Sequence, residues 1–297
     1  MEIFPLAKTD LGPAAKTLVE KIASATEALY APLGTVFQAL ADVSSDKIRA
    51  KGKIEAKLVR RLERLAAEET KKQNNLEAIY GQTFQLLNSE ADIAKIKQMD
   101  EDWIVFHSEK ARLVSDKEMQ TLWARIVASE SEAPGSYSKR TLDMLSVLEK
   151  AEAHLFTSVC RFIVRYNSEA NPVILCEQSN NCPSNVYTDL GLNPDTLLHL
   201  SAIGLVHYNR LSCRGDWIFD RPAIDLEYFG DRRTILISEI YGKYMLDFGI
   251  VSLTQVGRQL AGIAGAEPVE GFLDFLETEW AKRVLLEKTG TWLGRTL

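Results

Sequence analysis

A chain of 297 residues, 46% of them hydrophobic, is long enough to bury a sizeable core, and at roughly 100 to 200 residues per domain it predicts two units. A charged fraction of 26%, with 17 glycines and nine prolines spread along the chain, excludes a disordered or low-complexity protein. The net charge of −6 argues against a protein whose whole surface binds nucleic acid.

The start of the chain and its cysteines bear on localisation. Glu2 and Pro5 stand where a secretory signal would carry basic residues followed by an apolar run. No segment reaches the roughly 20 apolar residues of a spanning helix, so we expect a cytoplasmic protein. The four cysteines contain no C-x-x-C pair, which predicts reduced thiols; they are Cys160, Cys176, Cys182 and Cys213.

The first elements are helical. Apolar residues at helical spacing predict an amphipathic helix from Pro13 to about Tyr30. Residues 28–41 then carry no charge, a length too short to cross a bilayer and typical of a buried helix or an interfacial segment.

A basic helix follows, from Lys47 to Lys72. Ten basic and four acidic residues give this segment a charge of +6 and leave −12 for the rest of the chain. Its apolar stripe is narrow, which is typical of a helix packed on one partner. The candidate contacts with an anionic partner are Lys47, Arg49, Lys51, Lys53, Lys57, Arg60, Arg61 and Arg64.

Three interpretations of these cations remain open. They can form a solvated face paired with glutamates of the same helix, bind anionic lipid headgroups, or bind nucleic acid. The neighbouring uncharged segment 28–41 favours lipid over nucleic acid.

Further helices complete the first half. Apolar residues from Leu76 to Leu87 follow helical spacing closely. Asp102 is expected to cap a short helix through Lys110, and Ser115 with Glu118 has the spacing of a capping box. After a turn at residues 133–136, Ser138 is expected to open one long helix that continues to Phe162. The first half, residues 1–166, is therefore predicted to be an all-helical domain with its basic helix at 47–72.

The pattern changes in residues 167–297. A short β-type run at 172–175 precedes a helix capped by Asn193 and Pro194, and Gly204 separates that helix from a strand at 205–208. Runs at 224–229 and 234–238 predict a hairpin around Gly230 and Asp231. Two helices, from Ser252 or Thr254 onward and over 269–280, close the chain. This order of elements is that of a winged helix. The predicted fold class of the whole chain is mainly α, with a multi-helix domain followed by a winged-helix-like α+β domain.

Winged helices often bind DNA, but the helix that would enter the groove, residues 193–203, contains no Arg or Lys. Asp195 at its start would repel a phosphate. Arg232 and Arg233, near the tip of the hairpin, are the candidate wing contacts. The residues favour a packing or protein-interaction module over a DNA reader.

No motif for catalysis, a cofactor or a metal is found. The histidines lack H-x-x-x-H spacing, and neither a G-x-S-x-G elbow nor a phosphate-binding glycine loop is present. The glycines from Gly257 to Gly265 lie in a helical pattern and are expected to allow close packing. We therefore expect a protein that is not an enzyme.

Residues 114–156 resemble a group of bacterial proteins, some of them similar to the alpha-type abortive-infection proteins of phage defence, and residues 253–260 resemble the closing helix of that group. The residues that carry the resemblance are Ser115-Asp116-Lys117-Glu118-Met119, Leu122-Trp123-Ala124-Arg125-Ile126-Val127-Ala128, Pro134-Gly135-Ser136-Tyr137-Ser138, Thr141-Leu142 and Leu253-Thr254-Gln255-Val256-Gly257-Arg258-Gln259-Leu260. The resemblance implies a bacterial protein, cytoplasmic or membrane-peripheral, and transfers no catalytic residue.

The expected function is that of a non-enzymatic interaction or regulatory protein of the bacterial cytoplasm, which acts as a homo-oligomer or with a protein partner and which the resemblance links to phage defence. The alternative is a membrane-surface effector that uses segment 28–41 and the basic helix 47–72. A DNA-binding regulator is the third interpretation.

Overall fold

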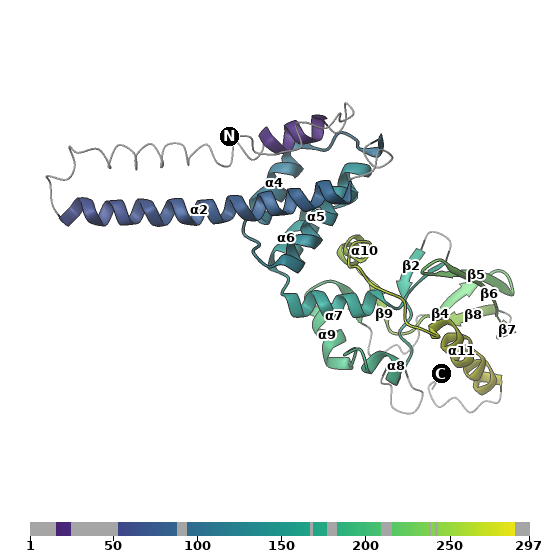
Figure 1. The fold of residues 1–297 in the computed structure, drawn as a ribbon. Coiled ribbons are helices and arrows are strands. Elements are labelled where there is room, and N and C mark those ends of the chain that lie inside the picture. Colours follow the sequence, from purple (N-terminus) through teal and green to yellow (C-terminus); the bar gives the residue numbers. More distant parts are fainter. Residues whose placement is uncertain are drawn as a thin grey trace. The chain divides into compact units, whose positions relative to one another are not determined.

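The computed structural model describes residues 16–24, 53–87, 94–166, 169–176, 183–208, 216–237, 239–240 and 243–288 (Figure 1). The chain divides into two compact units, Met1–Val147 and Leu148–Leu297. The secondary structure described in the first unit is helical, and the second unit contains sheets as well as helices, so the expected mainly α class is confirmed at this level.

The helical unit is built around one long helix. A stretch at 16–24 is helical, and the labelled helices are α2 (Lys53–Leu86), α4 (Glu101–Ala111), α5 (Lys117–Glu132) and α6 (Lys139–Val147). The uncharged segment 28–41 lies outside the described residues.

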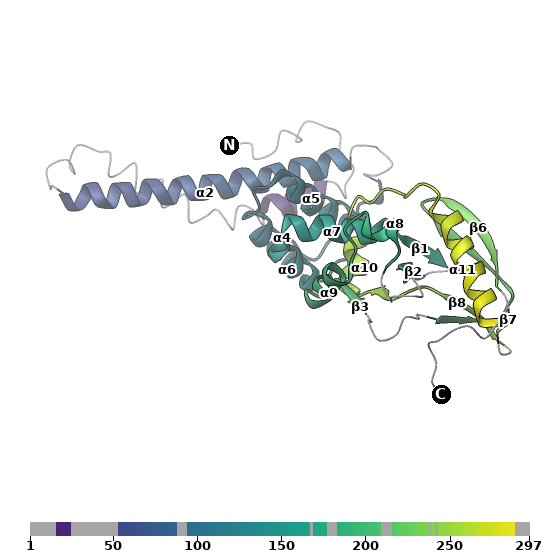
Figure 2. The same cartoon turned by 90° about the horizontal axis from the view of Figure 1, so that it is seen from below.

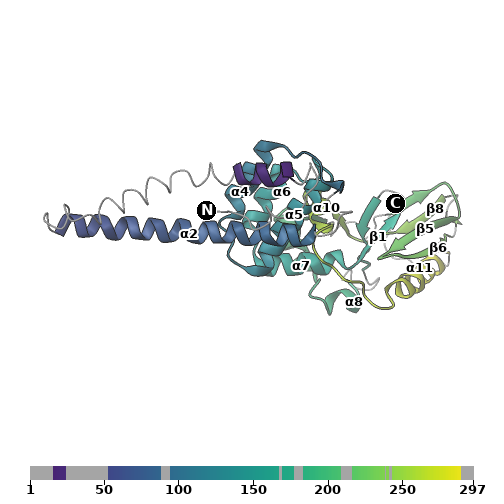
Figure 3. The ribbon, with the colours of Figure 1, turned by 45° about the horizontal axis from the view of Figure 1, so that its top comes forward.

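The C-terminal half of α2 packs on α4 and α5 (Figures 1 and 3). Leu76, Ile79, Tyr80 and Thr83 recur at helical spacing and are buried along this contact, which confirms the helix expected there. The Thr83 hydroxyl lies 3.1 Å from the Ile79 carbonyl and 3.3 Å from the Ala124 carbonyl, so it has acceptors on α2 and α5.

Aromatic rings fill the core of this unit. The imidazole of His107 stacks on Trp103, with 5.4 Å between ring centroids, and contacts Trp123 edge-on at 5.1 Å. Complete burial lowers the pKa of His107 to about 3, against a weaker opposing effect of its contact with the Trp123 carbonyl. The imidazole is therefore neutral at physiological pH.

The helix starts differ from the expected ones. Asp100, not Asp102, caps α4 by accepting the Trp103 N–H at 2.8 Å. Asp116, not Ser115, caps α5 by accepting the N–H groups of Glu118 and Met119. In both cases an aspartate in extended conformation lies beside the first turn, where a carboxylate also interacts favourably with the helix dipole.

The single long helix expected from Ser138 to Phe162 is wrong. Two helices occupy this stretch, α6 and α7 (Lys150–Cys160), with Glu149 extended between them. Glu149 and Glu152 form a capping box, in which the Glu149 N–H donates to the Glu152 carboxylate at 2.9 Å. This local pairing starts a new helix although the apolar spacing continues.

A buried carboxylate holds the turn between α5 and α6. Glu130, which is 3% exposed, accepts the N–H groups of Gly135 at 2.6 Å and Tyr137 at 2.9 Å. The indole of Trp103 donates to the Tyr137 carbonyl at 2.7 Å. The Pro-Gly turn is therefore fixed from within the unit.

The described strands of the second unit form three small sheets, some of whose strands are labelled in Figure 2. Its elements after α7 are β1 (Ile163–Tyr166), β2 (Glu169–Pro172), α8 (Asn185–Thr188), α9 (Pro194–Ala202), β3 (Val206–Tyr208), β4 (Asp216–Phe219), β5 (Ala223–Tyr228), β6 (Asp231–Leu236), β7 (Glu239–Ile240), β8 (Lys243–Asp247), β9 (Val251–Leu253), α10 (Gln255–Ala261) and α11 (Phe272–Lys288). The strand orders are β2-β1-β5-β6, β3-β9 and β4-β8-β7.

The hairpin expected around Gly230 is confirmed. Strands β5 and β6 pair antiparallel from Ala223 with Leu236 to Tyr228 with Asp231. Helix α11 covers one face of their sheet (Figures 2 and 3), where Phe272 contacts Tyr228 with ring centroids 5.2 Å apart. The Tyr228 hydroxyl donates to the Arg161 carbonyl and accepts from the Val269 N–H.

The expected caps and the close packing in this unit are also confirmed. Asn193 caps α9 in a capping box with Thr196. Thr254 caps α10 by accepting the Gly257 N–H at 2.9 Å. A Cβ on Gly257 would lie 2.0 Å from the Leu205 carbonyl oxygen, so this glycine lets α10 pack directly on backbone.

Candidate interaction surface on helix α2

The basic residues expected to bind an anionic partner fall into two groups. Lys47, Arg49 and Lys51 lie outside the described residues. Lys53 is the first residue of α2, and its side chain is likewise not described. The other four lie on α2 with their side chains exposed; they are Lys57, Arg60, Arg61 and Arg64.

These four cations, which we call the α2 basic face, have no carboxylate partner among the described side chains. The only contact described for them within the helix is a hydrogen bond from Arg64 Nε to the Arg60 carbonyl at 3.2 Å. Glu63 and Glu68 are exposed on the same helix but form no ion pair with them among the described residues. The described glutamates therefore do not hold these four cations in ion pairs.

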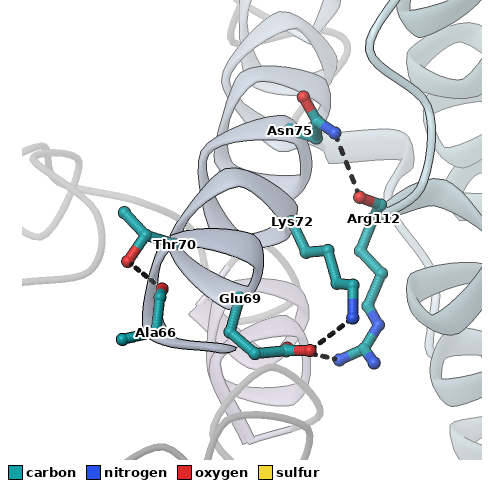
Figure 4. Close-up of polar contacts among 6 residues, drawn as sticks. All are labelled: Ala66, Glu69, Thr70, Lys72, Asn75 and Arg112. Atoms are coloured by element: carbon teal, nitrogen blue, oxygen red, sulfur yellow. Dashed lines mark hydrogen bonds and ion pairs between the residues drawn. The ribbon is translucent and has the colours of Figure 1, made fainter. Parts of the chain in front are cut away.

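One turn further along, the charges are paired (Figure 4). The Glu69 carboxylate accepts from the Lys72 ammonium and lies 3.5 Å from the Arg112 guanidinium, while the Asn75 amide donates to the Arg112 carbonyl at 3.1 Å. These contacts hold α2 against the end of α4. The basic segment of the sequence thus contains the α2 basic face, whose cations have no described carboxylate partner, and Lys72, whose ammonium is held in an ion pair.

Apolar side chains lie between the cations. Leu62 is partly buried and Leu65 is 43% exposed. Because residues three and four apart are neighbours on a helix, Leu65 lies beside Arg61. The α2 basic face is therefore amphipathic.

The two candidate wing contacts are engaged in ion pairs. Arg232 lies 3.0 Å from the Glu227 carboxylate and remains largely exposed. Arg233 is hydrogen-bonded to Asp274 on α11 and lies 3.5 Å from Glu277 and from Asp231. The hydrogen bond to Asp274 is the main cause that raises the pKa of Arg233. Arg233 thus ties the hairpin to α11, and the structure does not bring these arginines together with α9.

Helix α9 presents an uncharged to acidic surface. Asp195 is exposed in its first turn, and Leu198 is 55% exposed in the middle of the helix. His199 Nε2 lies 2.7 Å from the Glu152 carboxylate on α7. Leu198 is not among the residues that the sequence indicates as functional. Its only signal there is an apolar side chain, next to His199, at a position on the polar side of the helix.

The described residues offer little for metal or thiol chemistry. Within them, no three His, Cys, Asp or Glu side chains are grouped to hold a metal ion. Cys160 and Cys176 are buried free thiols, and burial raises the pKa of Cys160. None of the helices in the described ranges is long and apolar enough to cross a membrane.

The fold and this surface together describe a mainly α chain with a helical part and a sheet-containing part. The chain belongs to a family described as a protein of unknown function (DUF2806), whose model matches residues 59–277. The match begins within the α2 basic face and ends within α11. No curated protein and no solved structure matches the chain.

Proposed function

We propose that the protein is a non-enzymatic interaction or regulatory protein that binds an acidic protein surface through the α2 basic face. The observation that carries the proposal is the set of four exposed cations without carboxylate partners among the described side chains. The first partner to test is a second copy of the chain, because the residues outside 47–72 carry a charge of −12.

The spacing of the cations adds to this argument. Lys57 with Arg61 and Arg60 with Arg64 are i,i+4 pairs of like charge. Each such pair destabilises a helix by about 0.2–0.5 kcal/mol. Glu63, three residues after Arg60, and Glu68, four residues after Arg64, offset part of this repulsion, and an acidic partner would offset the remainder.

We further propose that the second unit contains a winged-helix-like module. The order α7, β2, α8, α9, β3, β9 supports it. So do the antiparallel pairing of β3 with β9 and the hydrogen bond from the Leu253 N–H on β9 to the Asn171 side chain on β2. In this proposal residues 209–250 are an insertion between β3 and β9, at the place of the wing. The exposed Leu198 and the absence of Arg and Lys from α9 favour protein contact over DNA.

The test is the molar mass of the full chain by size-exclusion chromatography with light scattering at low and high salt. We expect self-association at low salt that is lost at high salt and in the double variant Arg60→Glu, Arg61→Glu. The control is Lys97→Glu with Arg140→Glu, which reverses two exposed charges elsewhere in the helical unit and should associate normally.

Three outcomes would overturn the proposal. A monomer at every salt concentration that also retains no partner from cell extract would contradict it. Salt-dependent co-sedimentation with phosphatidylserine vesicles that Arg60→Glu, Arg61→Glu abolishes would replace it by the membrane-surface alternative. A gel shift with duplex DNA that weakens in Arg232→Glu, Arg233→Glu would favour the DNA-binding alternative.

We also propose phage defence as the biological setting, because residues 114–156 resemble a group of bacterial proteins, some of which are similar to abortive-infection proteins. The corresponding experiment compares plaque formation on cells with and without the gene. We expect fewer plaques with the natural chain than with Arg60→Glu, Arg61→Glu.

A further inference from the structure

A cleft lies in the second unit, between the four-stranded sheet and α10. Its volume is about 710 Å³, within the roughly 300–1,000 Å³ of small-molecule sites. The side chains that matter for recognition come from β1, β2, the β5–β6 hairpin and α10; they are Arg165, Glu169, Glu227, Phe229 and Arg258. None of them belongs to the α2 basic face, so this site is independent of the function proposed above.

Two arginines line the cleft and have no carboxylate partners in the described part of the chain. Arg165 lies opposite Glu227 in the pairing of β1 with β5, but the Glu227 carboxylate is bound to Arg232 at 3.0 Å. Arg258 Nη1 donates to the Leu253 carbonyl at 2.9 Å, which fixes its guanidinium at the start of α10. Guanidinium groups bind phosphate and carboxylate oxygens through paired hydrogen bonds, so these two arginines can hold an anionic group in a cleft that the carboxylates of Glu169 and Glu227 also line.

Phe229 supplies a flat apolar surface at an unusual place. It is the first residue of the two-residue hairpin turn, with a φ of +49°, and its side chain is 47% exposed. This turn position favours Asn, Asp or Gly, and a phenylalanine in this conformation costs free energy. Strained residues cluster at ligand sites, where the side chain is kept for what it contacts.

From these features we infer that the cleft binds a nucleoside monophosphate. Arg165 and Arg258 hold the phosphate, and Phe229 stacks on the base. Glu169, an exposed carboxylate on the cleft wall with no ion pair among the described residues, accepts hydrogen bonds from the sugar hydroxyls or the base amine.

The experiment is isothermal titration calorimetry of the full chain with adenosine monophosphate, inorganic phosphate and adenosine. We expect the monophosphate to bind more tightly than either fragment. Arg165→Gln should lower its affinity about tenfold or more, because a charge-assisted contact is lost. Arg221→Gln, an exposed arginine that does not line the cleft, should leave the affinity unchanged.

Two substitutions of Phe229 separate binding from strain. Phe229→Ala and Phe229→Asn both remove the ring and should each weaken adenosine monophosphate binding about tenfold. Phe229→Asn should melt at a higher temperature than Phe229→Ala, because asparagine tolerates the positive φ. The proposal is overturned if the natural chain does not bind the monophosphate, binds it no more tightly than phosphate, or binds it equally well after Phe229→Ala.

Discussion

Gly249→Ala should strongly destabilise the second unit. Gly249 has a φ of +89°, and a Cβ built on it would lie 2.0 Å from the Ile174 carbonyl oxygen and 2.5 Å from its carbon. The positive φ alone costs about 1–2 kcal/mol in an alanine. Overpacking adds about 1–3 kcal/mol, and shifting Ile174 weakens the 3.1 Å hydrogen bond from the Ile250 N–H, which contributes about 1 kcal/mol. We expect a total of about 3–6 kcal/mol.

Gly230→Ala is the matched control, because Gly230 has the same φ of +89° but no atom within 4 Å of an added Cβ. It should cost only the conformational part, about 1–2 kcal/mol. Urea unfolding followed by circular dichroism measures both free energies. Equal losses in the two variants would refute the close approach of Gly249 to Ile174 and leave only backbone conformation as the cause.

Two further predictions concern the interior of each unit. Gly257→Ala should destabilise the second unit by about 2–3 kcal/mol, because the added Cβ would meet the Leu205 carbonyl. Gly262→Ala is the control: the nearest atom to its added Cβ lies at 3.9 Å, so this variant should be neutral or slightly stabilised. Similar melting temperatures for the two variants would contradict the prediction. The depressed pKa of His107, about 3, means that the unfolded chain binds a proton below pH 6.5 that the folded chain does not, so the helical unit should lose about 2 kcal/mol between pH 7 and pH 5. Unfolding followed by tryptophan fluorescence should show this loss in the natural chain and not in His107→Phe, and parallel pH curves would exclude the histidine as its cause.

The features that could be predicted from the sequence are those fixed by neighbouring residues. Asn193 followed by Pro194 starts a helix by local hydrogen bonds, and the turn at Gly230 sets the pairing of the strands beside it. The close packing at Gly257 is visible as a glycine inside a helical pattern. In each case the cause lies within a few residues of the effect.

The features that could not be predicted depend on partners distant in the sequence or on competition between two local signals. Val206 pairs with Leu253 across the whole β4–β8 region, which no local pattern indicates. The break between α6 and α7 at Glu149 is not predicted, because apolar residues at helical spacing continue through it. Its only sequence signal is Glu152, which lies three residues later at the spacing of a capping box. In the basic helix, the sequence shows the cations. It does not show that Lys72, alone among the described ones, is linked through Glu69 on the same helix to Arg112 at the end of α4.

The turn at residues 133–137 has a practical consequence for protein engineering. An exposed Ala-Pro-Gly segment ordinarily looks suited to an inserted tag or to new chain ends in a circular permutant. Here its backbone N–H groups satisfy the buried Glu130 carboxylate. Extra residues between Pro134 and Tyr137 would leave a charge in the interior without its donors, so this segment should tolerate insertion poorly although it lies at the surface.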